Sequence, residues 1–410
     1  MTATAASGNA PSAPNLRTLT LRSFLLGLRE NMVRAVWQPF VLSMGASMPF
    51  LGLMESIGGY GGIVSTAMLP LGGWLSDRKG RKGFAILASA FTLCSLAVYA
   101  LAAWTRKWQW LLPGVVLYGL SAIARPAVDS MTAESASPAE RGRAYGLTMT
   151  FFAVSGVVAP AVGGFLAQRY GFLSVMLVGL GLETGTLAVI ALVLRETLPP
   201  EGRQIAIASD FLAMLRRSLT PPARLRSFYA AVTIDAFAFG MGAQIISGLL
   251  SKTYGFTPFQ LGLMASVGSM AWALPQMYFG RQVDKRGSVP FLIISEGISV
   301  VVIVGWLLAR SFAAFLAIQA LWGLAVATWV PSFLAWMANS VSERQRAEEL
   351  GRLGAFRGLL SFPAPYVGGL LYDAFGIRGP LVANLIGALG VIVIIWLFVR
   401  EPGRPEPVSR

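Results

Sequence analysis

The chain has 410 residues, of which 55% are hydrophobic and 13% are charged, whereas soluble domains carry about 25% charged residues, so an ordinary soluble protein is excluded. The formal net charge of +14 lies mostly in short connections between apolar blocks, which indicates membrane orientation rather than nucleic-acid binding. With one cysteine, Cys94, and no histidine, the chain has no internal disulfide, thiolate cluster or His-ligated metal, and we expect no metal and no cofactor.

The apolar blocks predict twelve membrane-spanning helices. About 20 apolar residues cross the core of a bilayer, and the last block, Leu381 to Val399, contains no charge. Ahead of the first block, Met1 to Leu21 is rich in Ala, Ser and Pro and lacks the apolar core of a cleaved signal, so we expect a disordered cytoplasmic tail. The predicted spans are 23–44, 54–76, 83–103, 109–131, 144–166, 172–194, 227–249, 259–281, 289–309, 312–337, 352–372 and 379–399.

The distribution of Lys and Arg predicts the orientation of these spans. Most of the 33 Lys and Arg residues lie on the side that also holds both termini, and the positive-inside rule makes that side cytoplasmic. We expect a multi-pass protein of the cell inner (plasma) membrane. The predicted divisions are a cytoplasmic tail at 1–22, a six-helix bundle at 23–194, a cytoplasmic loop at 195–226, a six-helix bundle at 227–399 and a cytoplasmic tail at 400–410.

The second half of the chain repeats the first about 205 residues later. The matches are Arg22-Ser23-Phe24 with Arg226-Ser227-Phe228, Leu51-Gly52-Leu53-Met54-Glu55-Ser56 with Leu261-Gly262-Leu263-Met264-Ala265-Ser266, Asp77-Arg78-Lys79-Gly80 with Asp284-Lys285-Arg286-Gly287, Pro160-Ala161-Val162-Gly163-Gly164 with Pro365-Tyr366-Val367-Gly368-Gly369, and Arg195-Glu196 with Arg400-Glu401. Six spans separate each pair, so both halves insert in the same orientation. Such a parallel repeat predicts two bundles that rock around a site between them.

A short basic motif lies between the second and third spans. Gly73-Trp74-Leu75-Ser76-Asp77-Arg78-Lys79-Gly80-Arg81-Lys82 resembles the signature of the major facilitator superfamily, and every defined position matches. The resemblance implies an all-α membrane fold of twelve helices in two pseudo-symmetric six-helix bundles. Gly80 suits the tight turn that this loop needs.

The resemblance also implies a conformational gate at the motif. In the family, the Asp of this motif is thought to hold the two halves together against the start of span 11. The residues expected to form the gate are Gly73, Asp77, Arg78, Gly80, Arg81, Asp284 and Arg357, with Asp284 facing the start of span 5 near Arg143. A second interpretation is that the loop only sets the topology. The family's antiporter pattern in span 5 is partly matched by Ala159 to Gly164, and its span 4 pattern is missing.

Ionisable residues inside the spans are candidates for ion coupling, because charge at membrane depth costs free energy. Without histidine, a coupled proton must be carried by a carboxylate. The candidates are Asp235, Glu30 and Asp129. Asp235 has no basic neighbour on its own helix, which favours it. Glu30 with Arg34, and Arg125 with Asp129, are four residues apart and are alternatively expected to neutralise each other. Glu183 and Glu296 have no role predicted from the sequence.

Spans 1, 4, 7 and 10 line the central cavity in the family, and this resemblance predicts the substrate contacts. They are Arg29, Arg34, Gln38, Arg125, Gln244, Trp329, Phe333 and Trp336. Together with Trp322, the three aromatic residues lie on one face of span 10. They form either an aromatic cavity wall or a packing surface.

These patterns predict a secondary transporter that moves small organic molecules by alternating access, with proton-coupled efflux of amphipathic compounds as the leading hypothesis. One alternative is a proton-coupled uptake symporter for an anionic metabolite, with the intramembrane arginines as the anion clamp. Another is a non-transporting receptor or scaffold on the same fold. No nucleophile–base pair or phosphate loop indicates an enzyme. The expected partners are a small-molecule substrate, protons and the lipid bilayer, and the expected oligomeric state is a monomer.

Overall fold

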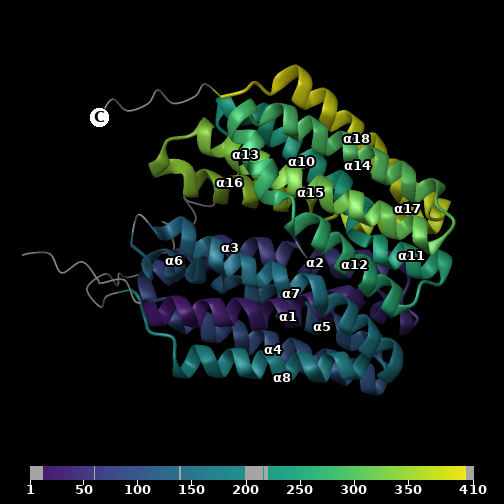
Figure 1. Cartoon of the computed structure of the whole chain (residues 1–410). Helices are drawn as coiled ribbons and strands as arrows, with labels where there is room; N and C mark the ends of the chain where they lie inside the picture. Colours follow the sequence, from purple (N-terminus) through teal and green to yellow (C-terminus); the bar gives the residue numbers. More distant parts are fainter. Residues whose placement is uncertain (1–12, 60, 138–139, 199–215, 217–219, 403–410) are drawn as a thin grey trace, which may run out of the picture.

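The computed structural model describes residues 13–59, 61–137, 140–198, 216 and 220–402. Every regular element within these residues is a helix, and the helices form two bundles that lie side by side (Figure 1). The N-terminal bundle is purple to teal in Figure 1, and the C-terminal bundle is teal-green to yellow. The predicted all-α membrane fold of two six-helix bundles is confirmed. The predicted central loop, 195–226, lies mostly outside the described residues.

Each bundle contains six spans, some of them divided into shorter helices. The N-terminal bundle comprises α1 (Ala13–Ser43), α2 (Met48–Gly58), α3 (Ile63–Lys79), α4 (Lys82–Thr105), η1 (Trp108–Trp110), α5 (Leu111–Leu120), η2 (Ser121–Ala124), α6 (Arg125–Glu134), α7 (Arg141–Tyr170) and α8 (Phe172–Leu192). The C-terminal bundle comprises η5 (Ala223–Leu225), α10 (Arg226–Met241), η6 (Ala243–Ile245), α11 (Ile246–Tyr254), α12 (Pro258–Ala273), α13 (Gln276–Arg286), α14 (Val289–Leu308), α15 (Phe312–Ser340), α16 (Glu343–Ser361), α17 (Ala364–Phe375) and α18 (Arg378–Phe398).

Eight helical segments of the described residues are long and apolar enough to cross a membrane by themselves. The other four predicted spans have identifiable reasons for falling short. α1 carries several charged residues, including Arg29 and Glu30. Spans 2, 8 and 11 are each broken into two helices, at Gly59–Gly62, at Leu274–Pro275 and at Phe362–Pro363. These breaks lie at glycine or proline, which favour the end of a helix.

The prediction of a disordered tail up to Leu21 is wrong for residues 13–21, which form the first turns of α1. Leu19 is fully buried, and Asn15 is 2% exposed. The Asn15 side chain accepts a hydrogen bond from Arg195 N (2.9 Å) and donates one to Arg195 O (3.1 Å). The start of α1 is therefore fixed to the end of the last span of its bundle. The prediction failed because residues 13–21 are buried against other helices of the protein, so they do not need the apolar composition of a segment that faces lipid.

The two bundles are joined mainly at the end remote from the start of α1 and the end of α18. There α2 packs on α17, and α12 packs on α7. Four glycines bring backbone against backbone: Gly52 meets Pro365, Gly369 meets Met48, Gly262 meets Pro160 and Gly164 meets Pro258. We call these eight residues the seam. In Figure 1 the bundles lie closest near α11, α12 and α17 and diverge toward α6, α13 and α16.

A serine hydroxyl strengthens each side of the seam. Ser56 Oγ accepts a hydrogen bond from Tyr366 N (3.2 Å), and Ser266 Oγ accepts one from Ala161 N (3.1 Å). Each donor directly follows a proline, where the regular ladder of helix hydrogen bonds is interrupted. The repeated Gly and Ser positions of α2 and α12 thus dock on the repeated Pro and Gly positions of the opposite bundle, which explains why these segments recur in the sequence.

The repeated Arg-Glu pair caps a helix in each bundle. Glu196 accepts hydrogen bonds from Arg81 N (2.9 Å) and Lys82 N (3.0 Å) at the start of α4, and from two amides of its own segment. Glu401 accepts from Ser288 N (2.7 Å) and Val289 N (2.8 Å) at the start of α14. A carboxylate at a helix N-terminus satisfies free amides and complements the helix dipole.

Replacing Glu196 by Ala is expected to destabilise the N-terminal bundle by about 1 kcal/mol at pH 7. Partial burial acts to raise the pKa of Glu196, but four backbone donors hold that pKa below its usual range. A group with a lowered pKa stabilises the fold above its ordinary pKa and loses that effect as the pH falls. In thermal unfolding of the detergent-solubilised protein, the difference from wild type should therefore shrink below about pH 4. Glu348→Ala, which removes an exposed glutamate, is the control.

Candidate functional site

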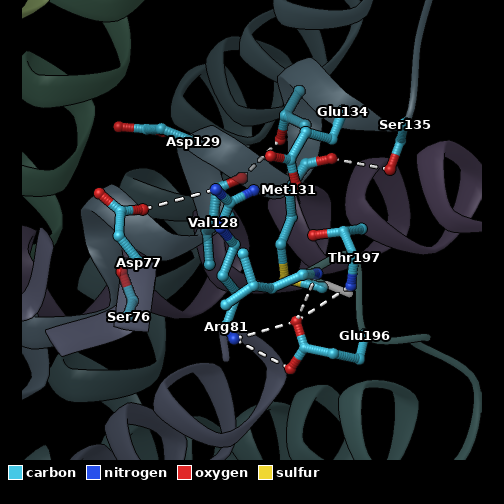
Figure 2. A network of polar contacts seen from close by, with 12 residues as sticks. Ser76, Asp77, Arg81, Val128, Asp129, Met131, Glu134, Ser135, Glu196 and Thr197 are labelled. Atoms are coloured by element: carbon cyan, nitrogen blue, oxygen red, sulfur yellow. Dashed lines mark hydrogen bonds and ion pairs between the residues drawn. The ribbon is translucent and has the colours of Figure 1, made fainter. Parts of the chain in front are cut away.

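The loop between α3 and α4 is organised by Arg81, which is 7% exposed. Its Nη2 lies 3.4 Å from Asp77 Oδ1, and its Nη1 forms an ion pair with Glu134 at the end of α6 (Figure 2). Its backbone N–H donates to Glu196. Gly80 has φ +101°, in the region that favours glycine. The motif from Gly73 to Lys82 therefore connects spans 2, 3 and 4 and the end of span 6 within one bundle.

The expected contact between Asp77 and span 11 is not formed among the described residues. The Asp77 carboxylate is 58% exposed, and its ion pair is with Arg81. Arg352, near the start of α16, instead lies 2.9 Å from Glu349, and Arg357 acts on Asp235. The divergence of the bundles at this end accounts for the separation. The gate role of Asp77 therefore stays a prediction.

The equivalent corner of the C-terminal bundle is built differently. In the C-terminal half of the repeat, Ser288 occupies the position equivalent to Arg81, and Asn339 occupies the position equivalent to Glu134. A cavity of about 400 Å³ lies here, lined by Asp284 among others. Asp284 is exposed, and the expected pairing with Arg143 is not formed among the described residues. A short serine leaves open the volume that the arginine fills in the other half.

Arg29 lies inside the N-terminal bundle, where it is paired with carboxylates. It is 4% exposed, its Nε lies 2.8 Å from Glu183 Oε2, and its Nη2 lies 3.6 Å from Glu30. Separating this buried pair would leave an uncompensated charge in an apolar interior. The pair gives Glu183 a structural role as the partner of Arg29, and contact of Arg29 with substrate stays a prediction.

Three other predicted residues of this bundle are more accessible. Arg34, Arg125 and Asp129 are exposed, although they lie on helices that cross the membrane. Arg34 acts electrostatically on Glu55 of α2. Opposite charge couples Arg125 to Asp129, but no ion pair within 4.0 Å joins them in the described part of the chain. Arg34 and Arg125 therefore stay candidates for contact with a ligand.

Gln38 and Gln244 connect the two bundles. Gln38 Nε2 donates to Gln244 O (2.7 Å) and to Glu55 Oε1 (3.2 Å), and Gln38 Oε1 accepts from Gly248 N (2.7 Å). Gln244 Nε2 donates to Glu55 Oε2 (3.5 Å). Gln38 is 7% exposed, so its amide serves the junction between bundles. Its assignment as a substrate contact stays a prediction, and the buried Glu55 is a residue of the junction that the sequence did not place.

In the C-terminal bundle, Asp235 of α10 meets Glu296 of α14. The two carboxyl groups line the same small cavity and interact with each other there. A hydrogen bond between two carboxyl groups requires a proton on one of them, because a carboxylate only accepts. Glu296 is 3% exposed. Its role was missed, although the signal was present: both residues are mid-span carboxylates without a basic neighbour on their own helices.

The aromatic stripe of α15 is largely a packing surface. Trp336 is 5% exposed, its ring centroid lies 3.7 Å from that of Phe228, and its Nε1 donates to Arg400 O (3.1 Å). Phe333 also stacks on Phe228, at 5.8 Å. Trp336 packs against Phe228 of α10 in this structure, and its expected role in a cavity wall stays a prediction. Trp329 and Phe333 are half-buried in the same cluster.

Two six-span bundles with charged groups buried between and within them define a polytopic membrane transporter of small molecules rather than an enzyme. The chain belongs to the Major Facilitator Superfamily, whose family model matches residues 19–251 and 228–410. This confirms the family expected from the motif at Gly73 to Lys82.

Sequence and structure similarities to other transporters extend over nearly the whole chain. It is 23% identical over 400 residues to "Multidrug resistance protein MdtG" of Serratia proteamaculans (strain 568), covering 95% of each sequence. The solved structure of the human organic anion transporter MFSD10 (TETRAN) matches with a TM-score of 0.66 and 21% identity, covering 94% of this chain and 100% of that one. The nucleoside transporter NupG matches with a TM-score of 0.72 and 14% identity, covering 93% and 98%. At these identities the solved structures show the fold alone.

Proposed function

We propose that this transporter couples the export of amphipathic organic compounds to the entry of protons. The observation that supports the proton coupling is the proximity of Asp235 and Glu296, whose carboxyl groups line one small cavity. Two carboxyl groups this close in an apolar interior favour sharing one proton, and Asp235 lies on α10, whose span is interrupted at Gly242. Coupling-ion sites of secondary transporters are typically built at such interrupted helices.

Export is supported by the full-length similarity to a multidrug resistance protein. The uptake of an anionic metabolite is the second candidate. Its support is the exposure of Arg34 and Arg125 on membrane-crossing helices. A receptor or scaffold without transport has less support, because it would not need a proton-bearing carboxyl pair inside a bundle.

The proposed orientation places both termini in the cytoplasm, at the plasma membrane, as the basic connections indicate. The seam would then close the outer end, and substrate would enter from the cytoplasm. In the opposite state, Asp77 would reach α16 and close the cytoplasmic end. We propose Gly73, Arg78 and Asp284 as further members of this gate. We also propose that the transporter acts as a monomer, since each chain contains both bundles.

Dye transport in proteoliposomes tests the proposal. With ethidium outside and an acidic lumen, wild-type protein should accumulate the dye, and a protonophore or equal pH on both sides should abolish the accumulation. Uptake of carboxyfluorescein driven by acid outside would instead support the anion symporter. If a pH gradient drives neither compound nor a wider set of drugs and organic anions, the proposed coupling is wrong.

A further inference from the structure

A small cavity inside the C-terminal bundle gathers four oxygen-bearing side chains. It has a volume of about 20 Å³ and is lined by Asp235, Glu296, Ser299 and Asn384, together with apolar residues. That volume accommodates one particle of about the size of a water molecule. The four polar residues come from three helices, α10, α14 and α18, so the tertiary fold assembles the group.

Asn384 is the residue that points to a ligand. It is 5% exposed, and its Oδ1 has no hydrogen-bond partner among the described residues. An amide oxygen is only an acceptor. The free-energy cost of burying it is therefore offset by a hydrogen-bond donor or a cation. Ser299 donates its own hydrogen to Ser295 O (3.0 Å), which leaves its oxygen lone pairs available. Asn384 Oδ1 and Ser299 Oγ can therefore both act as acceptors toward a ligand.

The backbone adds a negative potential at the same place. α10 ends at Met241, and Phe239 and Ala243, on either side of the interruption, both line the cavity. The C-terminal end of a helix carries a partial negative charge. Interrupted membrane helices use such ends to bind cations.

The charges around the cavity select a monovalent ion. Arg357 of α16 is the cation that acts on Asp235. Of the other helices near the cavity, α15 carries no charged residue, and α18 carries only Arg378, at its first position. With one proton on the pair, the remaining carboxylate and Arg357 cancel. When that proton leaves, one negative charge is in excess, and a single monovalent cation restores neutrality. A divalent ion would leave an excess positive charge in an apolar interior.

The other bundle shows why the site exists only once. In the internal repeat, Glu296 occupies the position equivalent to Ser89, by the same offset that relates Asp284 to Asp77. Ala388 occupies the position equivalent to Glu183, by the offset that relates Arg400 to Arg195. There, the Arg29 guanidinium lies against Glu183 at 2.8 Å. In the N-terminal bundle Arg29 already supplies the positive charge. In the C-terminal bundle the small side chain of Ala388 lines the cavity instead.

We propose that this cavity binds one sodium ion through Asp235, Glu296, Asn384 Oδ1 and Ser299 Oγ. Hard cations prefer oxygen ligands, and sodium is the smaller of the two abundant monovalent cations. The proposal rests on the carboxyl pair of the proposed function and adds a second coupling ion to it.

The experiment measures ion binding without transport. Purified wild-type protein is equilibrated with ²²Na⁺ at pH 8.5 and pH 6, and its thermal unfolding is followed in NaCl and in choline chloride of equal ionic strength. We expect about one bound ion per chain at pH 8.5, a rise in unfolding temperature on the order of 2 °C in sodium, and much weaker binding at pH 6. KCl should not reproduce the shift.

Asn384→Leu keeps the approximate side-chain volume and removes the oxygen, and it should weaken sodium binding roughly tenfold or more. Thr92→Val is the control, because it removes a buried hydroxyl that bonds within its own helix. Ser299→Ala replaces Asn384→Leu if that variant does not fold.

Absence of sodium binding to the wild type at pH 8.5, or unchanged binding in Asn384→Leu, would overturn the inference. The ethidium assay separates the two proposals. Proton-driven flux without sodium binding removes only the sodium site, and sodium binding without proton-driven flux removes only the proton-coupled function.

Discussion

The Asp235→Asn protein is expected to bind substrate but to lose transport driven by a pH gradient. The asparagine amide can donate to Glu296 as the protonated carboxyl group does, so the pair is held permanently in its proton-bearing form. A carrier that cannot release its proton cannot complete a coupled cycle. Ethidium accumulation in proteoliposomes with an acidic lumen should fall to the level of protein-free liposomes.

Two further variants sharpen this result. Glu296→Gln should behave like Asp235→Asn, because both carboxyl groups share one proton. Asp373→Asn makes the same chemical change on an exposed side chain of α17 and should transport normally. If Asp235→Asn still accumulates ethidium as the wild type does, Asp235 is structural, and Glu30 and Asp129 are the next carboxylates to test.

The Gly52→Ala protein is expected to fold but to disfavour the state in which the seam is closed. A Cβ atom at position 52 would lie 2.1 Å from Pro365 O, a backbone atom of the other bundle. Overpacking costs about 1–3 kcal/mol, which corresponds to a shift of roughly ten- to a hundredfold in a conformational equilibrium. Transport should fall by a similar factor, because every cycle passes through the closed seam.

A distance measurement across the bundles checks this directly. Spin labels at Trp104 and Phe375, both exposed, would be introduced as cysteines in a Cys94→Ala background. The label-to-label distance should increase in Gly52→Ala. Gly181→Ala is the matched control, since nothing lies within 4 Å of a Cβ at that position. An unchanged distance together with wild-type transport would show that the seam tolerates a methyl group.

The sequence was sufficient for the family, the spans and the position of the most informative carboxylate. Long apolar blocks and the Gly73–Lys82 motif are local signals, and Asp235 was recognisable because no cation lies near it on its own helix. Each of these features depends on residues that are close together in the chain.

Contacts between spans were not predictable in the same way. Glu296 and Asp235 are far apart in sequence, as are Arg29 and Glu183, and a span that is apolar on all sides has no pattern to show which face meets a neighbour. The same limitation affected Trp336: a stripe on one helical face is consistent with a cavity wall or a packing surface, and only Phe228 distinguishes them.

The chemistry of the seam implies that the two ends of the transporter respond differently to ionic strength. Its direct contacts are neutral and buried: glycine against backbone, and the hydroxyls of Ser56 and Ser266 on amides. Dissolved salt screens exposed charges but hardly affects such contacts. At the other end, Asp77 and Arg352 carry exposed or partly exposed charges. If Asp77 closes that end as proposed, high salt should weaken closure there alone, and salt concentration should displace the conformational equilibrium in a known direction.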